Sequence, residues 1–160
     1  MNKEKIIMTR KASDNKYLHR DFHITLNILL DYLDAQFGRD AVIQYLSQYA
    51  RAYHKPLHEQ LMAGNLTALS DYLTQIYRKE EWLVQIRTGE GFIEVQQDAC
   101  PGISHIKASG NQPSPCYVET YRTVYETLCE GTPFQYVLQR FDHDTGACIQ
   151  VFTKKEEEKL

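Results

Sequence analysis

The stretch 82–95, WLVQIRTGEGFIEV, marks a change in the pattern of apolar residues. Before it, apolar residues recur at the spacing of an α-helix, whereas within it successive residues alternate between two faces with a period of two. Its central residues 88–91, TGEG, are typical of a tight turn, because glycine adopts backbone conformations that other residues avoid. The stretch therefore predicts an antiparallel β-hairpin in the middle of the chain.

A second hairpin is predicted near the end of the sequence. Residues 134–141 and 147–153 have the composition and alternation of strands. Between them lies DHDTG at 142–146, whose aspartate and glycine residues favour turns. Strands joined by tight turns pair antiparallel, so the two hairpins together predict a four-stranded antiparallel sheet.

Helical periodicity accounts for most of the remaining sequence. Glycine and proline mark the boundaries, since Gly38 and Gly131 suit helix ends and Pro56 must bend or end the helix before it. Ser114 and Pro115 suit the cap and the first residue of the last helix. The predicted helices span residues 17–37, 40–55, 66–77 and 115–130, with a short helix plus a loop at 102–113.

The order of elements is three helices, a hairpin, a helix and a second hairpin. Because the helices are segregated along the chain rather than alternating with strands, this order predicts an α+β fold with the helices packed on the sheet. We expect a single α+β domain over residues 17–153. A flexible amino-terminal arm is expected at 1–16 and a charged tail at 154–160, where the sequence is polar and lacks an apolar period.

Composition and charge exclude several classes of protein. The chain has 160 residues, of which 18 are Lys or Arg and 21 are Asp or Glu, so it lacks the cationic surface of a general nucleic-acid binder. No apolar run approaches the ~20 residues that span a bilayer, and the first residues do not have the pattern of a leader. We therefore expect no nucleic-acid or membrane partner and a cytoplasmic location.

The four cysteines, all in the second half of the chain, are expected to be reduced thiols. Cys116 falls in the first turn of a predicted helix, where free amides and the helix dipole favour a thiolate. That position suits a nucleophile and, equally, a small buried residue. Cys100 ends a predicted strand and lies five residues before His105. Cys148 lies within the last strand, and Cys129 is expected to pack in the core.

Two pairs of histidines have the i,i+4 spacing that places both rings on one face of a helix. These pairs are His19 with His23 and His54 with His58, although Pro56 interrupts the second. Neither pair has the glutamate of an HExxH motif. His23 also lies beside the apolar stripe of its helix, which favours its projection into a cleft.

The turn at 142–146 places His143 between two aspartates. A carboxylate beside an imidazole raises its basicity, as in a general base, but aspartate is also common in turns for backbone reasons. The sequence contains no GxGxxG, Walker or GxSxG motif, so no cofactor is expected. Tyrosines recur on two predicted helices and either pack in the core, line a pocket or form a homodimer interface; they are Tyr45, Tyr49, Tyr53, Tyr117, Tyr121 and Tyr125.

Residues 98–153 carry a resemblance to a known family. They resemble the L-2-amino-thiazoline-4-carboxylic acid hydrolase family in having a Cys-Pro pair, a later cysteine followed by an acid, and a closing strand with glycine, cysteine and an aromatic residue. The same part is similar to the 4-vinyl-reductase small-molecule-binding domain, and both share the predicted order of helices and hairpins. The residues concerned are Cys100, Pro101, Cys116, Glu119, Arg140, Asp144, Thr145, Gly146, Ala147, Cys148 and Phe152.

The resemblance implies hydrolytic ring opening of a small cyclic amidine or amide, such as a 2-amino-thiazoline carboxylate, in a pocket lined by cysteines. On this hypothesis Cys116 attacks or contacts the substrate, His143 or His105 carries the proton, and amides at the helix start hold a carboxylate. The implied catalytic residues are Cys116, Cys100 and His143, and the implied substrate contacts are Cys148, Glu119, His105 and His23.

Two other functions stay open at this point. A pocket between the helices and the sheet suits a non-catalytic small-molecule-binding domain that senses an apolar or anionic ligand. The third alternative is a metal site built from the thiols and His105, for which two ligands alone are insufficient. For the hydrolase and for the binding domain alike, the expected partner is a small molecule.

Overall fold

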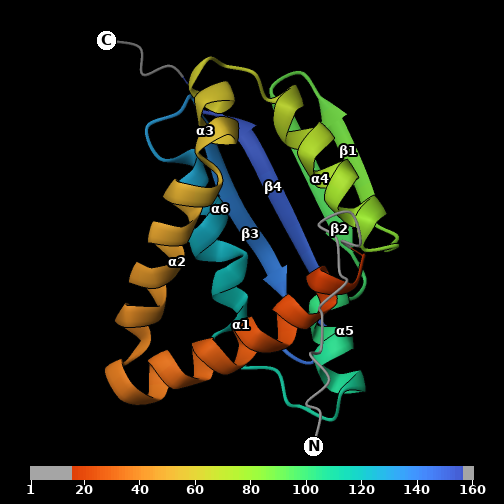
Figure 1. Cartoon of the computed structure of the whole chain (residues 1–160). Helices are drawn as coiled ribbons and strands as arrows, with labels where there is room; N and C mark the ends of the chain where they lie inside the picture. Colours follow the sequence, from red (N-terminus) through yellow and green to blue (C-terminus); the bar gives the residue numbers. More distant parts are fainter. Residues whose placement is uncertain (1–15, 157–160) are drawn as a thin grey trace, which may run out of the picture.

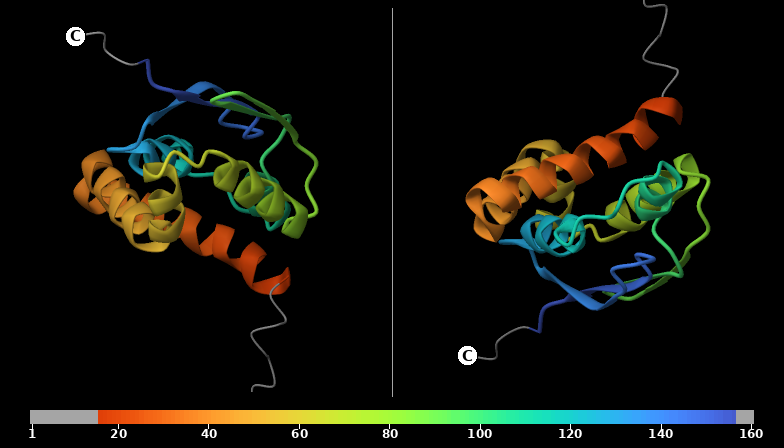
Figure 2. Two further views of the ribbon diagram at one scale, coloured as in Figure 1. Left: turned by 90° about the horizontal axis from the view of Figure 1, so that it is seen from above. Right: turned by 90° about the horizontal axis from the view of Figure 1, so that it is seen from below.

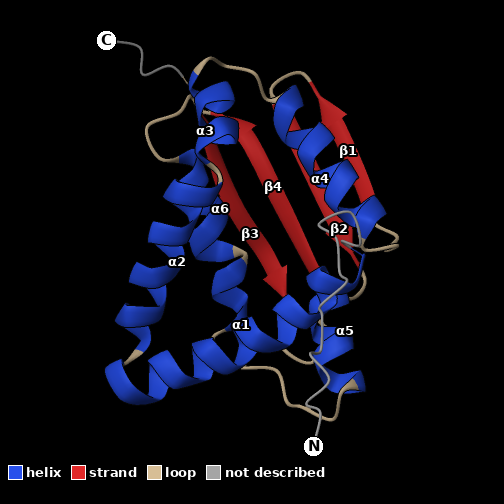
Figure 3. Cartoon of the chain, in the orientation of Figure 1, coloured by secondary structure: helices blue, strands red, loops and turns tan. Residues whose placement is uncertain are grey.

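A four-stranded antiparallel sheet forms one layer of the molecule, as the two hairpins predict (Figure 1, Figure 3). The computed structural model describes residues 16–156, and for 16–21 only the helical backbone. The strands lie in the order β1-β2-β4-β3, so that β2 and β4 pair at the centre of the sheet. The bounds are Gln85–Gly89 for β1, Phe92–Gln97 for β2, Phe134–Phe141 for β3 and Cys148–Lys154 for β4.

The helices form a second layer on one face of this sheet, as Figure 2 shows from above and below. This arrangement confirms the predicted α+β fold. None of the described helices combines the length and the apolar character needed to cross a membrane. The helices are α1 (Lys16–Phe37), α2 (Arg39–Tyr53), α3 (Lys55–Met62), α4 (Thr67–Lys79), α5 (Pro101–Ala108), the 3₁₀ helix η1 (Tyr117–Thr120) and α6 (Arg122–Cys129).

Two tight corners set the path of the first helices. Gly38 has a φ of 82°, a conformation that favours glycine, and it turns α1 into α2 within one residue. His54 forms the next corner, between α2 and α3, and Pro56 lies in the first turn of α3. Proline suits that position because its missing N–H would have no partner inside the helix. The predicted interruption at Pro56 is confirmed, and it leaves His54 at the corner.

The inner face of the sheet changes from apolar to polar along the strands. Alternation buries every second residue of β2 and β4, and these residues lie opposite one another across the central strand pair. Towards α5 the buried pair is polar, whereas at the other end it is apolar. The three pairs, in that order, are Gln97 with Cys148, Val95 with Gln150, and Ile93 with Phe152.

The buried apolar side chains form two clusters. One lies between the sheet and the helices α3, α4 and α6, and includes Leu61, Leu73 and Phe152. The other joins α1, α2 and α5, and includes Leu30 and Ile103. The clusters meet where α1, α2 and α4 face the segment that contains η1 and α6, and a cavity lies there.

Two predicted boundaries are wrong. The helix predicted over 115–130 is split into η1 and α6, because the Tyr121 N–H donates to the Val118 carbonyl three residues back, as in a 3₁₀ helix. The first strand begins at Gln85 rather than Trp82, whose indole and backbone N–H groups donate to carbonyls outside the sheet, those of Ala99 and Tyr77. The predicted arm and the end of the predicted tail lie outside the described residues.

Candidate functional site

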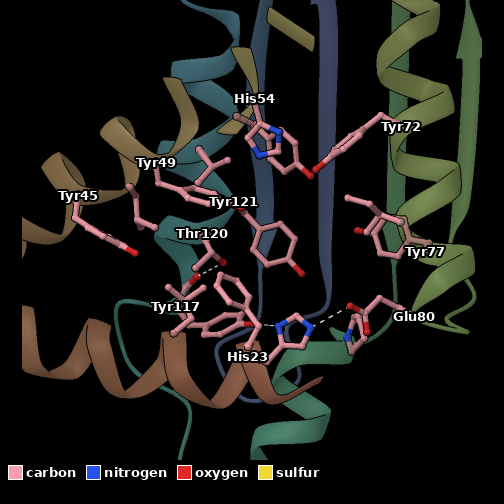
Figure 4. Close-up of a pocket in the computed structure, with 17 residues that line it drawn as sticks. His23, Tyr45, Tyr49, His54, Tyr72, Tyr77, Glu80, Tyr117, Thr120 and Tyr121 are labelled. Carbon is pink, nitrogen blue, oxygen red and sulfur yellow. Dashed lines mark hydrogen bonds and ion pairs between the residues drawn. The ribbon is translucent and has the colours of Figure 1, made fainter. Parts of the chain in front are cut away.

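A cavity of about 170 Å³ lies where α1, α2 and α4 face the η1–α6 segment (Figure 4). Aromatic rings form most of its wall, together with a few aliphatic and polar side chains. Five of the six tyrosines singled out from the sequence line it, while Tyr53 is 64% exposed. The tyrosines of the wall are Tyr45, Tyr49, Tyr72, Tyr77, Tyr117, Tyr121 and Tyr125.

One end of the cavity holds a chain of paired polar side chains. The Nε2–H group of His23 donates to the Glu80 carboxylate at 3.2 Å, and Nδ1 lies 3.1 Å from the Tyr117 hydroxyl. In the neutral ring this hydroxyl donates to Nδ1. The Glu80 side chain is only 6% exposed, so the acid is buried beside the imidazole. His23 thus projects into the cavity as predicted, with both ring nitrogens engaged (Figure 4).

The backbone of α5 lies directly against this pair. A Cβ atom at Gly102 would fall 2.6 Å from Nδ1 of His23 and would also overlap the Tyr117 hydroxyl. Glycine at this position therefore allows the helix to approach the His23–Tyr117 hydrogen bond closely.

The paired side chains continue from the cavity wall towards the sheet. The Tyr121 hydroxyl donates to the Cys100 sulfur at 3.0 Å and accepts from Nε2 of Gln97 at 3.0 Å. The Tyr77 hydroxyl donates to Oε1 of Gln97 at 2.7 Å. Buried polar groups joined in this way hold one another in place.

The opposite end of the cavity is built around His54 (Figure 4). This residue is 6% exposed, and the rings of Tyr49, Tyr53 and Tyr72 stand nearly perpendicular to its imidazole at centroid distances of 5.1 to 5.8 Å. Burial lowers the pKa of His54 below its ordinary value of 6.5, so the ring is neutral at pH 7. Within residues 16–156, no group hydrogen-bonds this imidazole.

Burial keeps the tyrosine hydroxyls of the wall protonated. It raises the pKa of Tyr49 to about 12 and also raises the pKa values of Tyr72, Tyr77, Tyr117 and Tyr121 above that of an exposed tyrosine. The wall therefore presents uncharged rings and hydroxyls, with the Glu80 carboxylate at the end near His23.

None of the cysteines is among the residues that line this cavity, so the predicted cysteine-lined pocket gains no support from it and stays a prediction. Cys100 and Cys148 do come together in the core next to the wall. Burial raises the pKa of the Cys100 thiol, and burial together with the neighbouring Cys100 raises the pKa of Cys148 to about 12. Both are protonated at neutral pH, which does not suit a nucleophile. Cys129 packs in the core as predicted.

Cys116 lies outside the cavity wall, beneath an arginine. Its sulfur accepts a hydrogen bond from Nη1 of Arg39 at 3.0 Å, and Nη2 of Arg39 pairs with Glu119 at 3.1 Å. Arg122 and Thr123 also bind the Glu119 carboxylate, at 3.2 and 2.7 Å, so this acid ties α2 to η1 and α6 and does not face the cavity. Burial raises the pKa of Cys116, and the Arg39 guanidinium offsets only part of that rise.

The two predicted proton carriers do not reach the cavity. His143 is exposed at the turn between β3 and β4. Asp142 accepts hydrogen bonds from the backbone N–H groups of Asp144 and Thr145 and from the Thr145 hydroxyl, so it shapes the turn and does not orient His143. His105 is half-buried on α5, outside the cavity wall.

The histidine pairs and the third alternative, a metal site, gain no support. The side chain of His19 lies outside the described residues, so the His19/His23 pair is not tested. The Nδ1–H group of His58 donates to the Leu128 carbonyl at 2.9 Å. In the part of the chain that the structure describes, no three His, Cys, Asp or Glu side chains are grouped as metal ligands would be.

Comparisons with known proteins add no relative. A scan against protein-family models finds no match, and searches of curated proteins and of solved structures find none either. The resemblance to the hydrolase family and to the 4-vinyl-reductase domain therefore stays a prediction, and the candidate site depends on the residues of this chain alone.

Glu80 and the role of His54 were not found from the sequence. Glu80 stands in the run KEE at 79–81, which has the composition of a solvated helix end. It lies three residues after Tyr77, a spacing that places both on one side of α4, next to the apolar stripe. From the sequence, this spacing is the feature that could have indicated that Glu80 is buried.

Proposed function

We propose that this protein binds a small, ring-containing and mainly apolar molecule in the aromatic cavity. The observation that carries the proposal is a cavity of about 170 Å³ whose wall combines tyrosine rings with a few polar groups. Ligand sites in proteins commonly have this composition, because apolar walls supply affinity and a few polar groups fix orientation. Of the predicted functions, this one corresponds to the small-molecule-binding alternative.

The volume limits the ligand to about the size of one substituted ring. An apolar cavity of about 150 Å³ accommodates benzene, and the present cavity has a similar volume of about 170 Å³. Drug-sized ligands occupy pockets of about 300–1,000 Å³. We therefore expect a ligand with one six-membered ring and few further atoms.

Binding is better supported than hydrolysis because the cavity lacks an activated nucleophile. The thiols lie outside its wall, and burial raises their pKa values. The hydroxyls of the wall belong to tyrosines whose pKa values burial also raises. The imidazole of His23 is engaged by Glu80 and Tyr117, and the wall holds no thiol that it could activate.

Titration with ethylbenzene, a neutral single-ring probe, tests the proposal by two-dimensional NMR. We expect saturable shifts of the cavity residues with a Kd at or below about 1 mM, which corresponds to about −4 kcal/mol. Ile76 lines the cavity from α4, so Ile76→Trp should fill it and weaken binding by more than about tenfold. Its neighbour Gln75 is exposed, so Gln75→Trp is the matched control and should bind like the wild type.

The proposal fails if the wild type shows no saturable binding or if Ile76→Trp binds as well as Gln75→Trp does. Hydrolytic ring opening of a cyclic amidine stays a prediction, and an activity assay tests it separately. Turnover of a 2-amino-thiazoline carboxylate by the wild type and its loss in Cys116→Ala would support that chemistry instead.

A further inference from the structure

We infer that His54 selects the ligand: the cavity takes ring molecules that carry an uncharged hydroxyl group, and this group hydrogen-bonds the His54 imidazole. The inference rests on the proposed function and adds the chemical class of the ligand and the residue that recognises it.

His54 is a histidine of the cavity wall whose ring has no hydrogen-bond partner in the described chain. It is 6% exposed and lines the cavity, and within the described chain neither a backbone nor a side-chain group bonds its ring. The ring nitrogens of His54 are not among the fully enclosed polar atoms of the described chain, so they face open space in which water or a ligand group can pair with them. A ligand that displaced this water without pairing with the ring would leave a donor or acceptor unsatisfied, at a cost of about 1–3 kcal/mol. A ligand group at this end would supply the missing partner.

Three tyrosine rings hold the imidazole in its orientation. The rings of Tyr49, Tyr53 and Tyr72 make angles of 84°, 90° and 88° with it, at centroid distances of 5.8, 5.1 and 5.4 Å. Packing of this kind restricts the imidazole from turning outwards to find water. Figure 4 shows His54 and Tyr72 at one end of the cavity, with His23 and Glu80 at the other.

The surroundings of His54 favour an uncharged hydroxyl over an ion. A neutral imidazole has one N–H donor and one acceptor nitrogen, and a hydroxyl can satisfy either of them. The side chains that pack around the imidazole are tyrosines from α2 and α4, and burial raises the pKa values of Tyr49 and Tyr72, so their hydroxyls carry no compensating charge. Burying an ion at this end would therefore lack a counter-charge.

The end near His23 does not offer the same vacancy. Both nitrogens of His23 are engaged, by Glu80 and by the Tyr117 hydroxyl. A ligand group that paired with the His23 ring would have to replace an existing hydrogen bond, whereas at His54 it adds a new one. The selectivity of the cavity is thus assigned to His54.

Three probes of nearly equal shape test the inference: ethylbenzene, benzyl alcohol and benzylammonium, which differ in a methyl, a hydroxyl and an ammonium group. Their Kd values are measured by NMR titration on the wild type, on His54→Leu and on His54→Gln. A hydroxyl loses water when it enters an apolar cavity, so without a partner benzyl alcohol binds far more weakly than ethylbenzene. The informative quantity is the ratio of the two Kd values in the same protein.

We expect His54→Leu to shift this ratio at least about tenfold towards ethylbenzene, and His54→Gln, which keeps a donor and an acceptor, to restore part of the preference for benzyl alcohol. Because both probes are measured on one sample, partial unfolding of a variant scales both Kd values equally and leaves the ratio unchanged. Benzylammonium is expected to bind the wild type most weakly.

If the ratio of the two Kd values is the same in His54→Leu as in the wild type, the inference is wrong. The proposed function is still supported in that case, provided that ethylbenzene binds the wild type saturably. Tightest binding of benzylammonium also overturns the inference, because the Glu80 carboxylate would then be the selecting group. If none of the probes binds the wild type saturably, the proposed function fails and the inference fails with it.

Discussion

At one end of the cavity His23 is hydrogen-bonded through both ring nitrogens, whereas at the other end the His54 ring has no such partner in the described part of the chain. Both histidines line the same cavity, and both come from the amino-terminal helices. They differ in their neighbours, because Glu80 and Tyr117 pair with the ring of His23, while tyrosine rings surround His54.

The hydrogen bonds at the His23 end of the wall therefore stabilise the fold, whereas the His54 ring remains able to bond a ligand. When a group is removed from a satisfied network, its former partner stays buried and unpaired, which lowers the free energy of unfolding. When an unpaired polar group is replaced by an apolar one of similar size, that penalty does not arise. Substitutions at the two ends should therefore have opposite consequences for stability and for binding.

The largest expected effect is at the paired end, for Gly102→Ala. The new Cβ would overlap the Tyr117 hydroxyl and Nδ1 of His23, so both side chains must move and their hydrogen bond breaks. We expect the free energy of unfolding to fall by about 3 kcal/mol, from overpacking and the lost hydrogen bond together. Urea denaturation measures it.

Gly110 provides the control for Gly102→Ala. It follows the same helix with a φ of 77°, and a Cβ there meets nothing within 4 Å. Gly110→Ala should therefore lower the free energy of unfolding only through backbone strain, by about 1 kcal/mol. If Gly102→Ala lowered it less than Gly110→Ala does, the close packing of α5 on the His23–Tyr117 pair would be contradicted.

A smaller effect is expected for Tyr117→Phe, which removes one hydroxyl from the paired end. The Nδ1 atom of His23 loses its partner and stays buried, so the free energy of unfolding should fall by about 1.5 kcal/mol. Tyr45 also lines the cavity, but in the described chain its hydroxyl makes no hydrogen bond. Tyr45→Phe should change the stability by less than about 0.5 kcal/mol, and equal effects of the two substitutions would argue against the network.

The fold was predictable because its signals are local. The turn at 88–91, the glycine at 38 and the proline at 56 act on their immediate neighbours, and each forms the turn or the helix end expected of it. The helix predicted over 115–130 is in fact split before Tyr121, where the chain forms a 3₁₀ helix. At this break the Tyr121 hydroxyl contacts Gln97 and Cys100. Those contacts join distant parts of the chain, and no local pattern contains them.

The site was predictable only where a residue lies beside an apolar stripe. His23 was expected in a cleft for that reason, and it lines the cavity. The resemblance placed Cys100, Cys116 and Cys148 in one pocket. Cys100 and Cys148 do lie together in the core, whereas Cys116 lies beneath Arg39. His54 was discounted because Pro56 breaks the spacing of its pair, although the corner made by that proline is what turns His54 towards the cavity.

The smallest expected effect is a difference in pH dependence between the wild type and His54→Leu. Burial holds the pKa of His54 in the folded state below its ordinary value of 6.5, so below that pH the unfolded chain takes up a proton that the folded chain does not. Stability rises with pH wherever the unfolded state binds more protons, so this histidine makes the wild type less stable as the pH falls through 6.5. The slope is at most about 1.4 kcal/mol per pH unit.

Urea denaturation of both proteins between pH 8.5 and pH 5.5 measures the difference. Between pH 8.5 and pH 7.5 the two curves should run parallel, since His54 is neutral in both states there. From pH 7.5 to pH 5.5 the wild type should lose about 1 kcal/mol more than His54→Leu does, because the other histidines are common to both proteins and cancel. A wild type that lost less than the variant would mean that the folded protein stabilises a charged His54, through a partner that the uncharged cavity end does not provide.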